Sequence, residues 1–512
     1  MFPEEVYSAE ETQHTASETG QAQFVQFVQE NYRCIVLVIV ITLKSSQCEA
    51  EGTMPRCCSW DRWNYCSRMP QHGPDSVHSW LVAGACAFSS FFAMAGRRSA
   101  GFLFVATLET FQVNRTEGSW PIMAMGAVVY LAGFITGPLA HRFNARPVII
   151  AGAVISAAGA ILSFFATSIG FMTLTLGVIH AIGSGMVFIV APTIISEHFV
   201  KNKGLAMGVN FAGVTAGLFV FPKLLEYLTA TYGLRGALLI FGAVIMNGLA
   251  FSLFPRTPAW RKASRGKNEL AAQFPSKAIG DNGTNELRHA LTVFKSPVFY
   301  LIIYSFNAYC FGYECYMSLF VDFACDRGVT LSTAVTVMSA GAISEIFGRF
   351  TLPAAGDRGL LSIKTAVVLT LAAEAVTFLV LPLLRSQGLI FTVAIVIAFI
   401  IGTAMVIFPV TLASYFGYEK MSVSFGIVVG SAGMLSFVKP SLIGHFRDRV
   451  GAYDWLFVIC GLLNGVGAAL WIVVLALERS RSKKELINNE SATQETIITT
   501  NCSNSFLHEF PR

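Results

Sequence analysis

Residues 388–412 read GLIFTVAIVIAFIIGTAMVIFPVTL, an apolar run without one charged side chain. A helix that crosses the hydrocarbon core of a bilayer needs about 20 mostly apolar residues, and this run is long enough. Every backbone donor and acceptor inside hydrocarbon must be paired within the chain, so we predict that the run forms a helix. The stretch therefore predicts an all-α membrane protein.

Eleven further runs of the same character bring the expected number of transmembrane helices to twelve. These runs cover residues 78–105, 120–141, 147–168, 170–195, 204–226, 236–255, 298–321, 331–354, 364–384, 421–445 and 453–477. Charged residues make up only 13% of the 512 residues, whereas soluble domains carry roughly 25%. This composition, with a net charge of only +5, excludes a soluble enzyme and a nucleic-acid-binding protein.

A basic loop divides the expected helices into two groups of six. The loop, residues 256–297, holds eight basic and three acidic side chains. Basic loops stay on the cytoplasmic side, so both termini are expected there. We therefore predict two six-helix bundles, 78–255 and 298–477, with a disordered cytoplasmic segment at 1–77 and a cytoplasmic tail at 478–512.

Neither the cysteines nor the glycines point to a cofactor or a substrate. The 11 Cys include no CxxC pair and no paired His spacing, so we expect no metal and no cofactor. Several GxxxG pairs lie inside apolar runs, where small residues let helix backbones approach closely. We interpret them as packing signals: Gly133–Gly137, Gly213–Gly217, Gly426–Gly430 and Gly461–Gly465.

Charged residues inside the apolar runs are the candidate functional residues, because a charge in hydrocarbon costs at least roughly 2.5–3.5 kcal/mol. Glu345 and Arg349 are four residues apart, so their charged groups meet on one helix face. We favour a functional pair over a structural one. Arg98 lies too deep in the first run to reach the membrane surface, whereas for Arg97 an interfacial or interhelical role is as well supported as a functional one.

Three other polar residues inside the runs have weaker claims. Glu314 in the seventh run fits an interhelical hydrogen bond or a proton site equally well. Lys439 in the eleventh run lies near the outer end, where its amine reaches the interface. His180 in the fourth run is interpreted as a packing hydrogen bond.

Several motifs identify a family. Residues 143–148 (FNARPV) follow Gly137-Pro138, and residues 199–208 (FVKNKGLAMG) precede Ala212-Gly213. Glu117-Gly118-Ser119-Trp120 lies before the second run, and Gly356-Asp357-Arg358-Gly359 follows the eighth. The sequence resembles the monocarboxylate transporters of the major facilitator superfamily, as a divergent member. The resemblance implies the major facilitator fold, with two six-helix bundles and alternating access.

The resemblance also implies roles for particular residues. Arg98 aligns with a lysine that binds substrate and proton, and Tyr130 with a tyrosine that lines the cavity. Glu345 and Arg349 align with an Asp-x-x-x-Arg pair implicated in proton and substrate binding, so Arg98, Arg349 and Tyr130 are expected to bind substrate and Glu345 to carry the proton. Two departures are Arg98, which cannot release a proton as lysine can, and residues 75–80 (DSVHSW), where the family has DGGWGW.

These residues predict a secondary active transporter of monocarboxylates or related small organic anions, coupled to a proton, in the plasma membrane. One alternative is a facilitative carrier of aromatic amino acids or other larger organic solutes. Another is a non-transporting sensor with a transporter fold, which the retained charges argue against. An enzyme is the weakest interpretation, because we find no nucleophile–base set in the sequence. The resemblance implies one further partner, a single-pass ancillary membrane protein, since some family members reach the cell surface with one.

Overall fold

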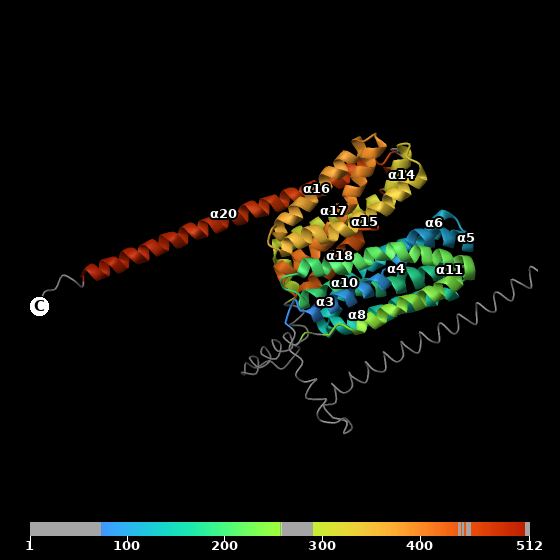
Figure 1. The fold of residues 1–512 in the computed structure, drawn as a ribbon, viewed down its shortest axis with the longest axis horizontal. Coiled ribbons are helices and arrows are strands. Elements are labelled where there is room, and N and C mark those ends of the chain that lie inside the picture. The colour runs from blue at the N-terminus through green and yellow to red at the C-terminus, as the bar shows by residue number, and fades with distance from the viewer. Residues whose placement is uncertain are drawn as a thin grey trace, which may run out of the picture.

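The computed structural model describes residues 73–256, 258, 290–438, 442, 445–446 and 452–506. The regular elements throughout these residues are helices, which lie in two groups side by side (Figure 1). We call helices α3–α11 the N-terminal half and helices α14–α20 the C-terminal half. The end of α20 projects beyond the bundle in Figure 1.

The N-terminal half contains helices that correspond to the first six apolar runs. They are α3 (Val77–Ala93), α4 (Ala95–Arg98), α5 (Ala100–Phe111), α6 (Arg115–Leu131), α7 (Gly133–Phe143), α8 (Ala145–Leu162), η1 (Ser163–Phe165), α9 (Ile169–Met172), η2 (Thr173–His180), α10 (Ala181–His198) and α11 (Lys203–Leu253). Two expected helices are joined in α11, where Gly233 takes a φ of +67° and breaks the helical path. Glycine adopts this conformation at no steric cost.

The C-terminal half corresponds to the last six runs. Its elements are η3 (Leu291–Lys295), α14 (Pro297–Asp326), α15 (Leu331–Asp357), α16 (Ile363–Val380), η4 (Leu381–Leu383), α17 (Gln387–Phe416), α18 (Met421–Leu435) and α20 (Asp454–Phe506). The loop expected at 256–297 and the segment expected at 1–77 fall largely outside the described residues.

Seven helical stretches of the described residues are long and apolar enough to cross a membrane. They are 115–143, 145–165, 169–198, 203–253, 363–383, 387–416 and 454–480. The 203–253 stretch holds two expected spans, while α14 and α15 carry charged residues in their interiors. Together with the broken first run and α18, each of the twelve predicted runs has a helical counterpart.

The first run differs from the single helix expected over 78–105. It is divided at Met94 and Ser99, whose φ and ψ are −87° and 4°, and −98° and 9°. The N–H of Ser99 donates to Ala95 and Gly96, which tightens the turn. The short helix α4 between these breaks carries both Arg97 and Arg98.

Glycines allow close backbone contacts between the two halves. The GxxxG pairs predicted close helix approach without saying which helices meet. A Cβ on Gly133 of α7 would lie 2.3 Å from the carbonyl oxygen of Gly426 in α18, and one on Gly426 would lie 2.5 Å from that of Gly133. A Cβ on Gly208 of α11 would lie 2.5 Å from the carbonyl oxygen of Arg349 in α15. Backbones from opposite halves therefore touch directly on two sides of the molecule.

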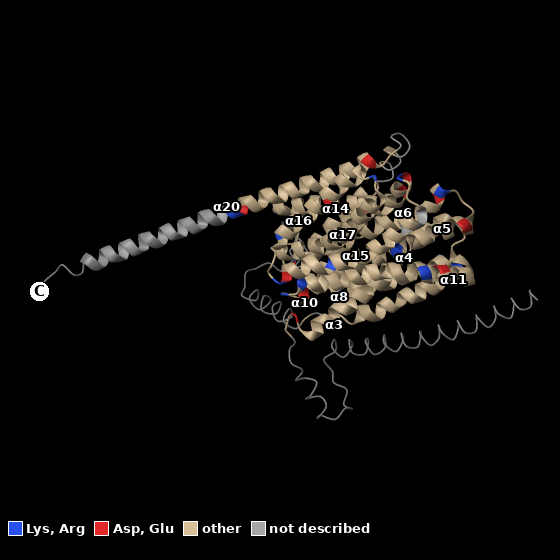
Figure 2. Cartoon of the chain, turned by 45° about the horizontal axis from the view of Figure 1, so that its top comes forward, with Lys and Arg blue, Asp and Glu red and all other residues tan. Residues whose placement is uncertain are grey.

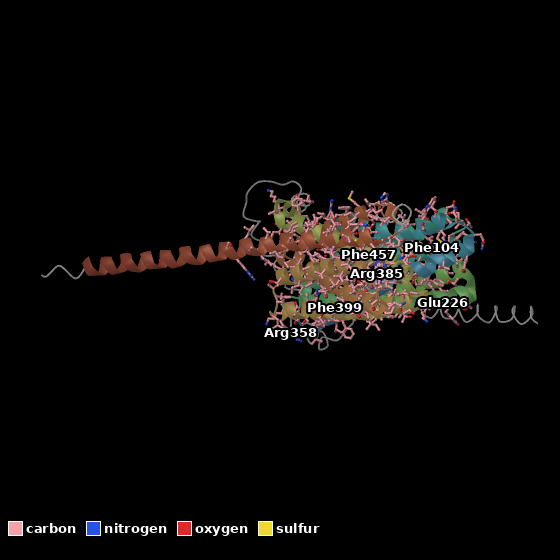
Figure 3. The ribbon with its side chains drawn as sticks, turned by 90° about the horizontal axis from the view of Figure 1, so that it is seen from above. Phe104, Glu226, Arg358, Arg385, Phe399 and Phe457 are labelled. Carbon is pink, nitrogen blue, oxygen red and sulfur yellow. The ribbon has the colours of Figure 1, made fainter. Side chains whose placement is uncertain are left out.

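Charged residues gather near the ends of the bundle, and uncharged residues make up most of its length (Figure 2). Figure 3 places Glu226 of α11 and Arg358, which follows α15, toward opposite ends of the bundle.

Candidate functional site

Glu345 lies at the centre of a cluster that joins the two halves. Its Oε1 accepts a hydrogen bond from Nη2 of Arg349, one turn later in α15. The same oxygen accepts from the hydroxyl of Thr215 in α11 at 3.1 Å and lies 3.8 Å from Nη2 of Arg98 in α4. The predicted pairing of Glu345 with Arg349 is confirmed, and the structure brings Arg98 to the same carboxylate. We call Arg98, Thr215, Glu345 and Arg349 the inner cluster.

Helix α17 packs closely against α15 next to Glu345. A Cβ on Gly402 of α17 would lie 2.0 Å from the carbonyl oxygen of Glu345, and one on Gly348 would lie 2.0 Å from that of Phe399. Only glycines allow the two backbones to come so near. Glu345 is 5% exposed and Arg349 1% exposed.

The inner cluster holds more positive charge than negative. Two guanidinium groups, Arg98 and Arg349, surround one carboxylate. Within the described residues, Nε and Nη1 of Arg349 are buried without a hydrogen-bond partner. Buried donors are normally paired, and leaving one unmet costs about 1–3 kcal/mol or more for a charged group. An anion that reached the cluster would supply the missing acceptors.

Arg98 is held in place from its own half. Its Nε donates to the carbonyl oxygen of Val214 in α11 at 3.1 Å. Gly217, one turn further along α11, lies beside the side chain, since a Cβ there would be in ordinary van der Waals contact with Cγ of Arg98 at 3.7 Å. Arg98 therefore belongs to the N-terminal half and Arg349 to the C-terminal half, and the two flank Glu345.

Arg97 and Glu314 form a second ion pair between the halves. Nη2 of Arg97 lies 3.1 Å from Oε1 of Glu314 in α14 and donates to the hydroxyl of Tyr130 at 2.9 Å. Nη1 of Arg97 donates to the carbonyl oxygen of Gly126, and the guanidinium group lies 4.5 Å from the centre of the Tyr130 ring. We call Arg97 and Glu314 the outer pair, and Tyr130 is the neighbour that contacts its arginine. Tyr130, expected to bind substrate, is thus placed against Arg97. Glu314 makes an interhelical hydrogen bond, which is one of the two roles that the sequence left open.

Two small cavities lie next to these charges. One is bordered by Glu345 together with Leu218 of α11 and Tyr316 and Met317 of α14. The other is bordered by Glu314 with Asn307 of α14 and Ser436, next to α18. Of the charged groups of the C-terminal half that the sequence singled out, Glu345 and Glu314 each border a cavity and Arg349 borders neither. Lys439 lies outside the described residues.

His180 makes packing hydrogen bonds, as expected. Its Nδ1 lies 3.1 Å from the hydroxyl of Ser156 and 2.9 Å from the carbonyl oxygen of the same residue. Its Nε2 lies 3.3 Å from the hydroxyl of Ser184. The ring packs directly against α4 at Gly96, where a Cβ would lie 2.5 Å from Nε2 of His180.

Two aspartates at the cytoplasmic end, as the topology predicts it, anchor the start of α11. Asp357 at the end of α15 accepts from the backbone N–H groups of Gly204 at 3.0 Å and Leu205 at 2.7 Å, which links the halves. Asp75 accepts from three consecutive N–H groups, those of residues 200–202, at 2.9–3.1 Å. Burial raises the pKa of Asp75, but these donors outweigh it, so the pKa lies below its usual value.

Sequence reasoning missed Thr215 as a member of the inner cluster. Threonine hydroxyls inside helices usually bond to a carbonyl of their own helix, so a threonine in an apolar run carries no signal. The contact between Arg97 and Glu314 was also missed, since 217 residues separate them.

Comparison with known proteins agrees with this architecture. The sequence profile of the Major Facilitator Superfamily matches residues 86–438. Monocarboxylate transporter 2 of Meriones unguiculatus is 27% identical over 448 residues, covering 84% of this chain and 92% of the relative. Monocarboxylate transporter 14 of Homo sapiens is 25% identical and covers 81% of this chain and 94% of the relative.

Two solved structures share the fold. The proton:xylose symporter XylE, bound to 6-bromo-6-deoxy-D-glucose, matches with a TM-score of 0.60 and 15% identity, covering 77% of this chain and 94% of that one. FucP in its outward conformation matches with a TM-score of 0.56 and 14% identity, covering 77% and 99%. The chain therefore belongs to the Major Facilitator Superfamily, and it is a multi-pass membrane transporter rather than an enzyme.

Proposed function

We propose that the protein moves monocarboxylates or related small organic anions across the membrane, each with a proton, by alternating access. The observation that carries the proposal is the inner cluster, in which arginines from both halves share one buried carboxylate. Relatives at 23–27% identity carry the name monocarboxylate transporter, which supports the same solute class.

The protonation state of Glu345 would decide whether the arginines can bind an anion. When Glu345 is ionised, it accepts from Arg349 and attracts Arg98, so it competes with a carboxylate solute. When it is protonated, its charge is gone and both guanidinium groups are available. Arginine binds a carboxylate through two parallel hydrogen bonds, which gives the site its preference for planar anions.

The position of the cluster links solute binding to the movement of the two halves. A carboxylate held between Arg98 and Arg349 would contact the N-terminal and the C-terminal half at once. One proton moving with one monoanion carries no net charge. A lone unit charge would instead feel about 2.3 kcal/mol per 100 mV of membrane potential. Coupling through Glu345 therefore makes transport independent of that potential.

A facilitative carrier of larger organic solutes, such as aromatic amino acids, is the second candidate. The observation that favours it is Arg98, because arginine keeps its charge at all relevant pH values. A site whose N-terminal cation never titrates can bind a carboxylate without a coupled proton. This candidate predicts uptake that does not depend on external pH.

Substitution of Glu345 by glutamine tests the proton role. Glutamine resembles the protonated acid and cannot ionise, so Glu345→Gln should remove the pH dependence of uptake. The measurement is uptake of labelled lactate, pyruvate and an aromatic amino acid at two external pH values, corrected for the amount of protein in the membrane. Glu226→Gln, an exposed carboxylate of α11, is the control. Wild-type pH dependence in Glu345→Gln would refute the proton role.

We further propose a plasma-membrane location with both termini in the cytoplasm, supported by the basic residues of the 256–297 loop. Asn114, in a glycosylation sequon, then lies outside, and its exposed side chain caps α6 by accepting from the N–H of Glu117 at 3.0 Å. The variant Thr116→Ala removes the sequon and keeps this cap. The wild type should show a shift in gel mobility that endoglycosidase removes, and Thr116→Ala should lack this shift. If this loop were on the cytoplasmic side, the wild type would show no shift either.

A further inference from the structure

The break in the first run at Met94 leaves one backbone carbonyl without its helical partner. In an unbroken helix the carbonyl oxygen of Ala93 would accept from the N–H of Arg97, four residues later. The backbone bonds at the break instead run from Met94 to Ser90 and from Arg98 to Met94. Within the described residues, no backbone N–H donates to the carbonyl of Ala93, which is a buried residue. Buried carbonyls are normally paired, so another group has to supply the donor.

The hydroxyl of Ser184 in α10 supplies this donor. Its Oγ lies 2.6 Å from the carbonyl oxygen of Ala93, and the bond is buried. The carbonyl oxygen of His180 is the next acceptor, at 2.9 Å. A hydroxyl has one proton, so the proton goes to the nearer acceptor, Ala93. Helix α10 therefore caps the end of α3, although 91 residues separate the two partners.

Other polar groups hold the hydroxyl of Ser184 in this orientation. Nδ1 of His180 lies 2.9 Å from the carbonyl oxygen of Ser156, which can only accept, so this nitrogen carries a proton. The hydroxyl of Ser156 lies 3.1 Å from Oγ of Ser184 and donates to it, since the proton of Ser184 is used at Ala93. Side chains from η2, α8 and α10 thus form one chain of hydrogen bonds that ends at the break.

Glycines on both sides of Ser184 fix its position. A Cβ on Gly183 would meet the backbone nitrogen of Ser156 in α8, and one on Gly185 would meet the carbonyl oxygen of Val129 in α6. Small residues of this kind let helix backbones touch. Helix α10 is therefore held against α8 and α6 by its backbone, and Ser184 faces α3 between these two contacts.

The break at Met94 decides where the arginines of α4 point. Arg98 donates to the carbonyl oxygen of Val214 at 3.1 Å and lies 3.8 Å from Oε1 of Glu345. Met94 has φ and ψ of −87° and 4°, whereas a continuous helix requires about −63° and −42°. Closing the break would change these angles and so rotate α4 relative to α3. The guanidinium group of Arg98 would then leave Glu345.

We propose that Ser184 is a positioning residue for the anion site: its hydroxyl keeps the first run broken and so holds Arg98 beside Glu345. The inference rests on the proposed function, which assigns anion binding to Arg98. Without the hydroxyl, the N–H of Arg97 is the donor that helical geometry offers to the carbonyl of Ala93. The helix then closes and carries Arg98 away from the carboxylate.

Hydrogen–deuterium exchange of the full chain in detergent tests the break without any transport. Within the described residues the N–H of Arg97 has no backbone partner, and in Ser184→Ala the closed helix would bond it. We expect this N–H, read from a peptide that covers residues 94–98, to exchange about tenfold more slowly in Ser184→Ala than in the wild type. Ser196→Ala is the matched control, because this buried hydroxyl of the same helix bonds to Thr193 within α10 at 2.7 Å. Unchanged or faster exchange in Ser184→Ala overturns the proposal.

Uptake kinetics test the consequence for Arg98. Ser184→Ala should raise the KM for lactate by about tenfold, as the loss of a charged hydrogen bond allows, while the maximal rate per amount of protein in the membrane stays near that of the wild type. Ser196→Ala should change neither value. A lower maximal rate with an unchanged KM would show that Ser184 does not act on the anion site, and would overturn the proposal. A wild type that takes up no lactate, pyruvate or aromatic amino acid would refute the proposed function, and the exchange measurement would still decide whether Ser184 keeps the helix broken.

Discussion

Arg97 and Arg98 are neighbours in one short helix, but they meet the C-terminal half in different ways. Arg98 shares Glu345 with Arg349, and the two partners are 6% and 1% exposed at their side chains. Arg97 forms an ion pair with Glu314, and these side chains are 21% and 14% exposed. Among the described residues, the inner cluster thus buries two cations with one anion, whereas the side chains of the outer pair are more accessible.

This difference indicates different roles. Moving an ion from water into a protein interior costs several kcal/mol of desolvation free energy. Only well-placed partners for the ion offset this cost. In the outer pair, the hydrogen bonds of Arg97 to Glu314, Tyr130 and Gly126 offset this desolvation cost. The inner cluster leaves donors of Arg349 unmet. The unmet donors of the inner cluster support our proposal that it binds an anion, whereas in the described part of the chain the outer pair joins the halves without unmet buried arginine donors.

The largest effect is expected from breaking the inner cluster. Arg349→Gln should lower butyrate or lactate uptake by about a hundredfold or more, since it removes a charged anion donor and leaves Glu345 buried with weaker partners. Arg97→Gln, the matched change in the outer pair, should lower uptake of the same acids by less than about tenfold, because partly exposed pairs contribute about 1 kcal/mol. The measurement is initial uptake per amount of protein in the membrane.

The double variants sharpen the same comparison. Arg97→Gln combined with Glu314→Gln should restore lactate uptake to near the wild-type rate, since the double variant leaves neither partner of the ion pair charged. Arg349→Gln combined with Glu345→Gln should stay inactive, since the anion site itself is lost. Equal losses for the two single arginine variants, or rescue of the inner double variant, would contradict the division of roles.

The sequence predicted the parts of this comparison that depend on short spacing. Four residues separate Glu345 from Arg349, so helical geometry alone places their charged groups together, and the structure has that bond. The glycine pairs predicted close helix contacts, and Gly133 and Gly426 make one. The apolar runs predicted the helices, because hydrocarbon leaves the backbone no other way to pair its polar groups.

Contacts between distant parts of the chain could not be predicted in this way. Nothing in the periodicity of the first run relates Arg98 to Glu345, and only the family resemblance suggested that they meet. The breaks at Met94 and Ser99 were also hidden, because the first run contains no proline to mark them. These breaks form the short helix α4 on which two consecutive arginines meet two different carboxylates.

The smallest expected effect concerns Thr215, whose hydroxyl donates to Oε1 of Glu345 at 3.1 Å. Thr215→Val keeps the shape of the side chain and removes its hydroxyl. In the wild type this hydroxyl donor stabilises the ionised carboxylate of Glu345 more than the protonated one. The pH of half-maximal lactate uptake should therefore rise by roughly one unit, while the maximal rate at acidic pH stays the same. Thr411→Val is the control, because this equally buried hydroxyl bonds to Ile407 of its own helix at 2.8 Å. A shift to lower pH, or equal shifts in both variants, would show that Glu345 does not set the proton dependence, and the inner cluster would then bind the anion without coupling it to a proton.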